Sequence, residues 1–172
     1  WDSAVVQSGT SVLAYARLAA SLTVGPGGTL QFTNWTASLT LSGAATIQSN
    51  GVVTLPAAFA ASQMSNRVHV ICTDLTIDPG GKIDADARGY AHDNGPGRGT
   101  GGWHCSGGGY GGKGGRANND PAIPGVAYGS PEAPLAPGSG AGGADGYGSE
   151  GGGAVRIDAS GTVTVNGTIT AN

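Results

Sequence analysis

Apolar and polar residues alternate in short runs between residues 67 and 87, and this pattern predicts three short β-strands. Apolar residues at every second position are typical of a strand with one buried face. Two breaks separate the runs, one at residues 73–74 and one at residues 78–81, where Pro and Gly favour a tight turn. The alternating apolar positions are Val68, Val70, Cys72, Leu75, Ile77, Ile83 and Ala85.

The same pattern recurs along the chain. Residues 22–31 match residues 75–84 position for position, including the Pro-Gly-Gly of the turn. Residues 39–48 form a third copy with a degenerate turn, and residues 163–170 form a fourth, in which Asn-Gly shortens the corner. Internal repeats of this length indicate stacked coils, each of which cannot bury its apolar face alone.

The spacing of the copies predicts the size of a coil. Copies start at residues 22, 39 and 75, which is close to one and two units of about 18 residues. A strand also precedes the last copy, since residues 154–159 stand where residues 67–72 stand before the copy at 75. The sequence therefore predicts an all-β solenoid of stacked coils.

A chain of 172 residues is expected to form one domain. Residues 1–20 alternate in a way that fits a strand and also fits one or two helical turns. We expect a strand-like lead-in segment, or a cap that covers the first coil. Residues 56–66 break the pattern and predict a loop or a short helix outside the stack. The expected parts are a lead-in or pairing segment (1–20), coils (21–87), a glycine-rich excursion (88–153) and a final coil (154–172).

Glycine is concentrated in one segment. Residues 88–153 hold 24 of the 34 glycines, and no apolar periodicity survives there. Such a segment cannot contribute a conventional core. It is sparsely charged and carries several aromatic residues, so we expect an ordered surface excursion packed along the stack. These aromatic residues are Tyr90, Trp103, Tyr110, Tyr128 and Tyr147.

Charge and hydropathy exclude some classes of partner. The formal net charge is −3, and the eight Lys and Arg residues are scattered, so the chain lacks the positive field that nucleic-acid binding needs. No apolar run of about 18 residues is present, so we expect no membrane span. The chain begins with Trp1, which indicates a processed chain or a segment of a longer one.

Two kinds of covalent modification are predicted. A disulfide between Cys72 and Cys105 would tether the glycine-rich segment, although Cys72 also fits a small core residue and Cys105 an unpaired thiol. Asn34 and Asn166 each begin an Asn-X-Thr sequence, the acceptor pattern for glycosylation. That pattern also arises by chance in strands rich in threonine.

Three stretches carry a family resemblance. Residues 75–85, 128–134 and 151–157 resemble the glycine-rich β-solenoid repeats of large bacterial cell-surface and secreted proteins. The resemblance covers residues 75–172 and leaves out residues 1–20. It implies a right-handed parallel β-helix and a secreted or cell-surface location. It implies no reaction, because no catalytic signature of that family can be placed on this chain.

Two stretches of the chain bear on nucleotide and metal binding. Residues 107–114 nearly match a phosphate-binding loop, but Gly114 stands where Ser or Thr must reach the magnesium ion. Oxygen-rich residues follow the third coil and could ligate calcium, or could serve as turn residues. We expect no cofactor and no metal. The oxygen-rich residues are Asp84, Asp86, His92, Asp93 and Asn94.

Catalysis is permitted by the fold class but not favoured by the residues. Paired carboxylates need a defined separation on rigid elements, which a glycine-rich segment supplies poorly. We therefore expect no enzyme activity. Trp103 and Tyr110 could stack on sugars, so a cell-surface polysaccharide is a candidate partner. The catalytic candidates are Asp93, His104, Lys113, Arg116, Asp120 and Glu150.

The last strands suggest a function. Residues 163–171 carry no charge and no proline, the features that normally block the end of a β-stack. We expect Val163, Val165 and Ile169 to pair with another copy, which predicts a head-to-tail homopolymer, an extracellular filament. The same features fit a segment of a longer repeat protein. The alternative is a carbohydrate-binding or polysaccharide-degrading β-helix module.

Overall fold

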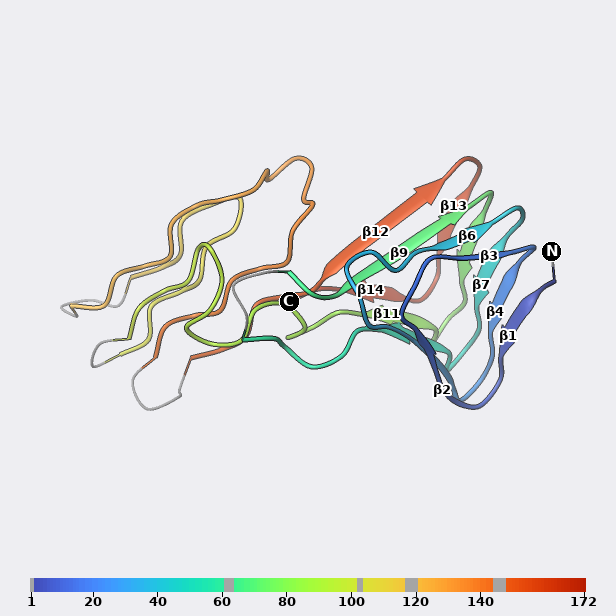
Figure 1. The fold of residues 1–172 in the computed structure, drawn as a ribbon, viewed down its shortest axis with the longest axis horizontal. Helices are drawn as coiled ribbons and strands as arrows, with labels where there is room; N and C mark the ends of the chain where they lie inside the picture. Colours follow the sequence, from blue (N-terminus) through green and yellow to red (C-terminus); the bar gives the residue numbers. More distant parts are fainter. Residues whose placement is uncertain (1, 61–63, 102–103, 117–120, 144–147) are drawn as a thin grey trace. The chain divides into compact units, whose positions relative to one another are not determined.

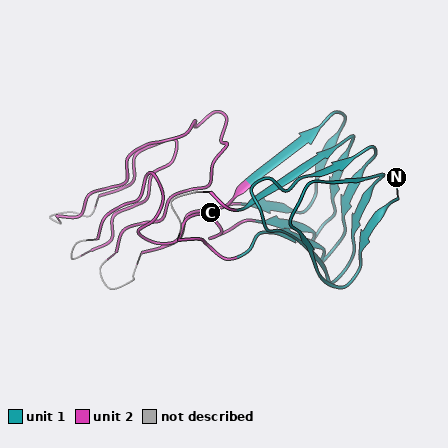
Figure 2. Cartoon of the chain, viewed as in Figure 1, with its two compact units in different colours: residues 1–56, 66–84, 155–170 teal, residues 57–65, 85–154, 171–172 magenta. Residues whose placement is uncertain are grey.

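The computed structural model describes residues 2–60, 64–101, 104–116, 121–143 and 148–172. The described residues contain fourteen β-strands and no helix, so no helix there is long and apolar enough to span a membrane. The chain divides into two compact units (Figure 2). Unit 1 comprises Trp1–Pro56, Asn66–Asp84 and Val155–Thr170, and unit 2 comprises Ala57–Ser65, Ala85–Ala154 and Ala171–Asn172.

The strands form three parallel sheets, whose neighbouring strands can be followed in Figure 1. Sheet A has the order β1-β4-β7-β10-β13, sheet B has β2-β5-β8-β11-β14, and sheet C has β3-β6-β9-β12. The strands are β1 (Ala4–Val6), β2 (Gly9–Leu13), β3 (Arg17–Ala19), β4 (Leu22–Val24), β5 (Gly28–Phe32), β6 (Leu39–Leu41), β7 (Ala45–Ile47), β8 (Val52–Thr54), β9 (Arg67–Cys72), β10 (Leu75–Ile77), β11 (Lys82–Asp84), β12 (Ala154–Ala159), β13 (Val163–Val165) and β14 (Thr168–Thr170).

Successive strands visit sheets A, B and C in turn, so that each coil adds one strand to each sheet. The first four coils are β1-β2-β3, β4-β5-β6, β7-β8-β9 and β10-β11-β12, and a fifth begins with β13-β14. The pairings between strands of neighbouring coils in the described residues are parallel, for example that of Leu75 with Val163. This arrangement confirms the predicted all-β solenoid built as a parallel β-helix.

Alternation places one column of side chains inside each sheet. In sheet A, Val24 pairs with Ile47 and Ile47 with Ile77, and these three side chains are at most 1% exposed. The period-two prediction for residues 67–87 is confirmed, because every apolar position it named is buried. Apolar residues of successive coils stack on one another in these columns, which buries apolar surface that a single coil would expose to water.

A glycine recurs at the corner between sheets A and B. At Gly28, Gly51, Gly81 and Gly167, an added Cβ would lie 2.2–2.6 Å from a carbonyl oxygen of another coil. The neighbouring backbone therefore leaves no room for a side chain at this corner. The Pro-Gly-Gly sequence was predicted to turn the chain, and the structure shows that its last glycine also lets adjacent coils approach.

The register of the third copy was predicted wrongly. Residues 39–41 form β6 in sheet C, whereas Ala45–Ile47 is the strand that pairs with Leu75–Ile77 in sheet A. Leu22 pairs with Ala45, and Ala45 with Leu75, so these coils are offset by 23 and 30 residues rather than by about 18. The Leu-Thr-Leu of residues 39–41 imitates a sheet A strand because all three sheets use the same alternation.

The first twenty residues also differ from the expectation of a lead-in or cap. They form a complete coil, in which β1, β2 and β3 each pair with a strand of the second coil. Their strand character was predicted, and helical turns are not formed. The described part of residues 56–66 contains no helix. Its residues between 57 and 65 belong to unit 2, where Phe59 forms an isolated parallel bridge with Tyr90.

Unit 2 is built from extended segments that bond to one another through their backbones. Gly107 N–H donates to Gly115 O, Gly114 N–H to Gly125 O, and Gly125 N–H to Gly107 O, which closes a cycle of three segments. Glycine is required where backbones touch, since a Cβ on Gly125 would lie 1.9 Å from Gly97 O. The same constraint puts glycine at the crowded axis of collagen. The segment thus forms a core of backbone rather than a conventional one.

Aromatic rings complete the interior of unit 2. Tyr90 is only 2% exposed, and its ring packs against Phe59 with 4.6 Å between centroids. Tyr110 packs edge-on against Tyr128 with 4.9 Å between centroids, and the Tyr128 hydroxyl donates a hydrogen bond to Pro137 O. Burial raises the pKa of both Tyr90 and Tyr128. These rings fill the space that the glycines leave empty.

Candidate functional site

The last two strands of unit 1 expose residues that face the interior of the solenoid. Val163, Val165 and Ile169 are 49%, 45% and 40% exposed. Their pairing partners in β10 and β11 occupy the same columns and are at most 1% exposed. These three residues are therefore exposed because no described coil of unit 1 lies over them, and not because they face outward.

Sheet C ends one strand earlier than the other two sheets. Among the described strands, sheets A and B contain five and sheet C contains four, with β12 last. A hollow of about 560 Å³ runs along the ends of the sheet C strands, and its lining includes Cys72, Ile157 and Asp158. The end of unit 1 formed by β13, β14 and β12, which we call the C-terminal end, thus presents three sheet edges and the exposed column residues Val163, Val165 and Ile169.

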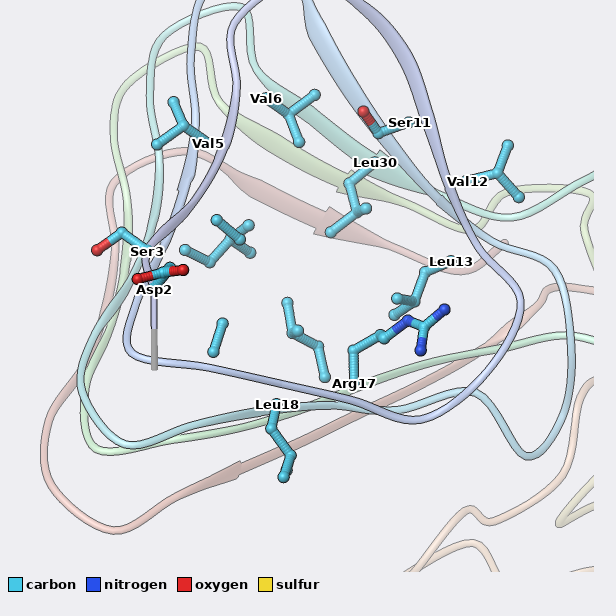
Figure 3. A pocket seen from close by; sticks show the side chains of 14 residues that line it. Asp2, Ser3, Val5, Val6, Ser11, Val12, Leu13, Arg17, Leu18 and Leu30 are labelled. Carbon is cyan, nitrogen blue, oxygen red and sulfur yellow. The ribbon is translucent and has the colours of Figure 1, made fainter.

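The opposite end of unit 1, which we call the N-terminal end, is formed by β1, β2 and β3. It encloses a cavity of about 410 Å³ whose lining includes Leu22, Leu30 and Leu39 (Figure 3). In Figure 3, Leu13 and Arg17 point into this opening, whereas Leu18 points away from it. Arg17 pairs with Leu39, so an exposed charged residue occupies an interior column at the last position of sheet C.

Charged side chains gather on the outer face of sheet C. His69 Nε2 lies 2.9 Å from Asp158 Oδ2, and Arg156 Nε donates to both oxygens of Asp158 at 3.1 and 2.8 Å. Arg67 Nη2 lies 3.4 Å from His69 Nδ1, and the Arg67 guanidinium lies over the Trp35 ring, 4.7 Å from its centroid. We call these five residues the sheet C cluster.

The charges of the side chains in the sheet C cluster are only partly balanced. The hydrogen bond from His69, followed by the bond from Arg156, holds the pKa of Asp158 below its usual range. Burial, and then the nearby positive charge of Arg156, lowers the pKa of Arg67. Arg67 Nε is buried and has no hydrogen-bond partner among the described residues. A buried polar atom without a partner costs about 1–3 kcal/mol.

The predicted modification sites lie in different environments. Cys72 is a buried free thiol in β9, and Cys105 is exposed in unit 2, so their disulfide stays a prediction. Asn34 Oδ1 accepts hydrogen bonds from the N–H and the hydroxyl of Thr36. Asn166 is exposed at the corner between β13 and β14. Glycosylation also stays a prediction at both asparagines.

Of the two candidate sugar-stacking residues, the structure describes Tyr110. Trp103 lies outside the described residues, and the Tyr110 hydroxyl accepts hydrogen bonds from the N–H groups of Leu135 and Ala136. Of the catalytic candidates, Asp120 also lies outside the described residues. Asp93 adopts a positive φ of 58° and its N–H donates to Ala141 O, which is a turn role.

The calcium candidates take part in local contacts. Asp84 Oδ2 forms an ion pair with Lys82 Nζ at 2.8 Å, and Asp86 Oδ1 accepts a hydrogen bond from Asn172 N–H. Asn94 Nδ2 donates to His92 O. The described residues contain no group of three or more His, Cys, Asp or Glu side chains able to hold a metal ion.

The sheet C cluster was not predicted. The sequence held a signal for the charged part of the cluster, because residues 154–159 match residues 67–72 and polar positions alternate with apolar ones in both segments. Outward residues of two adjacent strands must then lie side by side. Trp35 had no such signal, since it lies between β5 and β6 and only the fold brings it to Arg67.

The fold defines the protein as a parallel β-solenoid. Comparison of the chain with family models, with curated proteins and with solved structures finds no match.

Proposed function

We propose that the protein is an extracellular structural protein whose right-handed β-solenoid units stack end to end into a filament or cell-surface fibre. The proposal rests on one observation: Val163, Val165 and Ile169 face the interior column and are 40–49% exposed. Another coil placed on them would bury them as fully as their partners in β10 and β11 are buried.

Two physical terms favour such stacking. Full burial of an exposed Val or Ile side chain stabilises a contact by about 1.5–3 kcal/mol. Val163, Val165 and Ile169 are 40–49% exposed, so each would contribute roughly half of that before the cost of association. The edges of β13 and β14 also leave backbone groups ready to pair with a further parallel strand. Because the two ends of a coil stack differ, the contact is head-to-tail and propagates.

Arg17 is the main obstacle to stacking at the N-terminal end. A charge in an interior column protects a sheet edge against pairing, because burying it without a partner is costly. Arg17 belongs to sheet C, however, and sheet C is one strand shorter at the C-terminal end. In the proposed contact, Arg17 faces the position without a strand, where water reaches its guanidinium.

The same open ends suit a segment of a longer repeat protein, in which further coils of the same chain cover them. A carbohydrate-binding role is the second candidate, and the sheet C cluster is the observation that favours it.

The test compares two Ile→Lys variants. Ile169→Lys introduces a charge at the C-terminal end, whereas Ile123→Lys introduces one at a side chain of unit 2 that is 62% exposed. We expect filaments in electron micrographs of the wild type and of Ile123→Lys, and dispersed particles for Ile169→Lys. Wild-type monomers at high concentration, or unaltered filaments of Ile169→Lys, would refute end-to-end assembly.

A further inference from the structure

We propose that the outer face of sheet C binds an acidic polysaccharide, with Arg67 and Arg156 holding a sugar carboxylate beside Trp35. The inference rests on the second candidate function named above and does not depend on whether the ends of unit 1 stack. It uses the sheet C cluster, formed by β9, β12 and the connection between β5 and β6.

The first argument is charge. The cluster holds two guanidinium groups and one carboxylate. Arg156 donates to both oxygens of Asp158, which also contacts His69, whereas Arg67 contacts His69 and the Trp35 ring. One carboxylate cannot neutralise two arginines, so the cluster keeps an excess positive charge. A second carboxylate at this place would complete the charge balance, and the planar guanidinium fork matches a carboxylate with two parallel hydrogen bonds.

The second argument is the unused hydrogen-bond capacity of Arg67. Its Nη2 lies 3.4 Å from His69 Nδ1, a long contact, and its Nε is buried without a partner among the described residues. Burial and the neighbouring Arg156 lower the pKa of Arg67, as expected for a cation that lacks full compensation. Structures normally pair such buried polar groups, so the unpaired Nε shows that the Arg67 guanidinium is incompletely compensated. Because Nε itself is covered by protein, a carboxylate would meet Arg67 at its terminal nitrogens.

The third argument concerns the kind of molecule that carries the anion. The Arg67 guanidinium covers the Trp35 ring at 4.7 Å from its centroid, and Trp35 as a whole stays partly exposed beside the cation. A sugar ring has an apolar face for such a surface and hydroxyl groups for neighbouring polar side chains. A uronic acid unit combines the carboxylate and the ring.

The test is isothermal titration of the full chain with trigalacturonate at low salt, because salt screens exposed ion pairs. We expect saturable binding that Arg156→Gln and Arg67→Gln each weaken about tenfold or more, the usual loss when a charged hydrogen bond is removed. Arg98→Gln, which removes an exposed arginine of unit 2, should leave the affinity unchanged. Arg156 is 46% exposed, so its variant keeps the test valid even if Arg67→Gln fails to fold.

Two further ligands separate the outcomes. A heparin-derived trisaccharide carries sulfate, and a neutral galactan trisaccharide carries no charge. Binding of trigalacturonate with a chemical-shift change at the Trp35 indole supports the proposal. Preference for the sulfated sugar, equal binding of the neutral sugar, equal losses in all three arginine variants, or no binding would each overturn it.

Discussion

Replacing Gly125 by alanine tests the idea that unit 2 is held together by direct contact between backbones. The ideal Cβ at this position would lie 1.9 Å from Gly97 O, whereas real Cβ atoms stay beyond 3.0 Å. The two segments must therefore separate by more than an ångström. That movement stretches the bond from Gly125 N–H to Gly107 O and the bond from Gly114 N–H to Gly125 O, both 2.9 Å long.

The size of the effect follows from those two bonds. Each buried hydrogen bond contributes about 0.5–1.5 kcal/mol, and an unsatisfied backbone group costs about 1–3 kcal/mol. We expect Gly125→Ala to destabilise the cycle of Gly107, Gly114 and Gly125 by about 2 kcal/mol or more. That corresponds to about 30-fold faster amide hydrogen exchange at these residues.

Gly115→Ala is the matched control. Gly115 belongs to the same cycle, because its carbonyl accepts from Gly107 N–H, yet a Cβ there would meet no atom within 4 Å. We expect this change to alter exchange little or to slow it, since alanine reduces the freedom of the unfolded chain. If Gly125→Ala and Gly115→Ala gave the same exchange rates, close backbone contact would not be what requires glycine in unit 2.

Two other predictions concern ionisable side chains. Burial, and then the negative charge of Asp74, raises the pKa of the Cys72 thiol, so iodoacetamide at neutral pH should label exposed Cys105 well before Cys72. Mass spectrometry of the labelled peptides measures this, and equal labelling would contradict the burial of Cys72. The hydrogen bond from His69 lowers the pKa of the Asp158 carboxyl in the folded protein. The ionised carboxylate therefore stabilises the fold fully above the usual carboxyl pKa of about 4, and this stabilisation is lost as the pH falls through the lowered pKa. The effect should be small because the side chain is 40% exposed, and Asp158→Asn should abolish it in acid-unfolding curves.

Local pattern was sufficient to predict much of unit 1. Alternation at residues 67–87 identified strands β9, β10 and β11 and the side chains they bury. It failed for residues 39–48, where a Leu-Thr-Leu run resembled a sheet A strand but belongs to sheet C. Period two tells which face of a strand is buried, and it carries no information on which of three similar sheets the strand joins.

The exposed residues of the C-terminal end could be predicted in part, and the complete sheet C cluster could not. Val163, Val165 and Ile169 were identified from an uncharged terminal strand, and the structure added that they continue buried columns. The cluster needed a contact between Trp35 and Arg67, which are distant in sequence. Such contacts depend on how a corner places its side chains, which no local pattern specifies.

Stacked β coils could be predicted from the amino-acid sequence, because alternation and repeated turns act over a few residues. Tertiary structure alone decided the lengths of the coils, the sheet that each strand joins, and the use of glycine in unit 2. These properties arise from contacts between segments far apart in the chain. A carbonyl oxygen 1.9 Å from the place of a missing Cβ explains the glycine at position 125, and its partner lies 28 residues away, at Gly97.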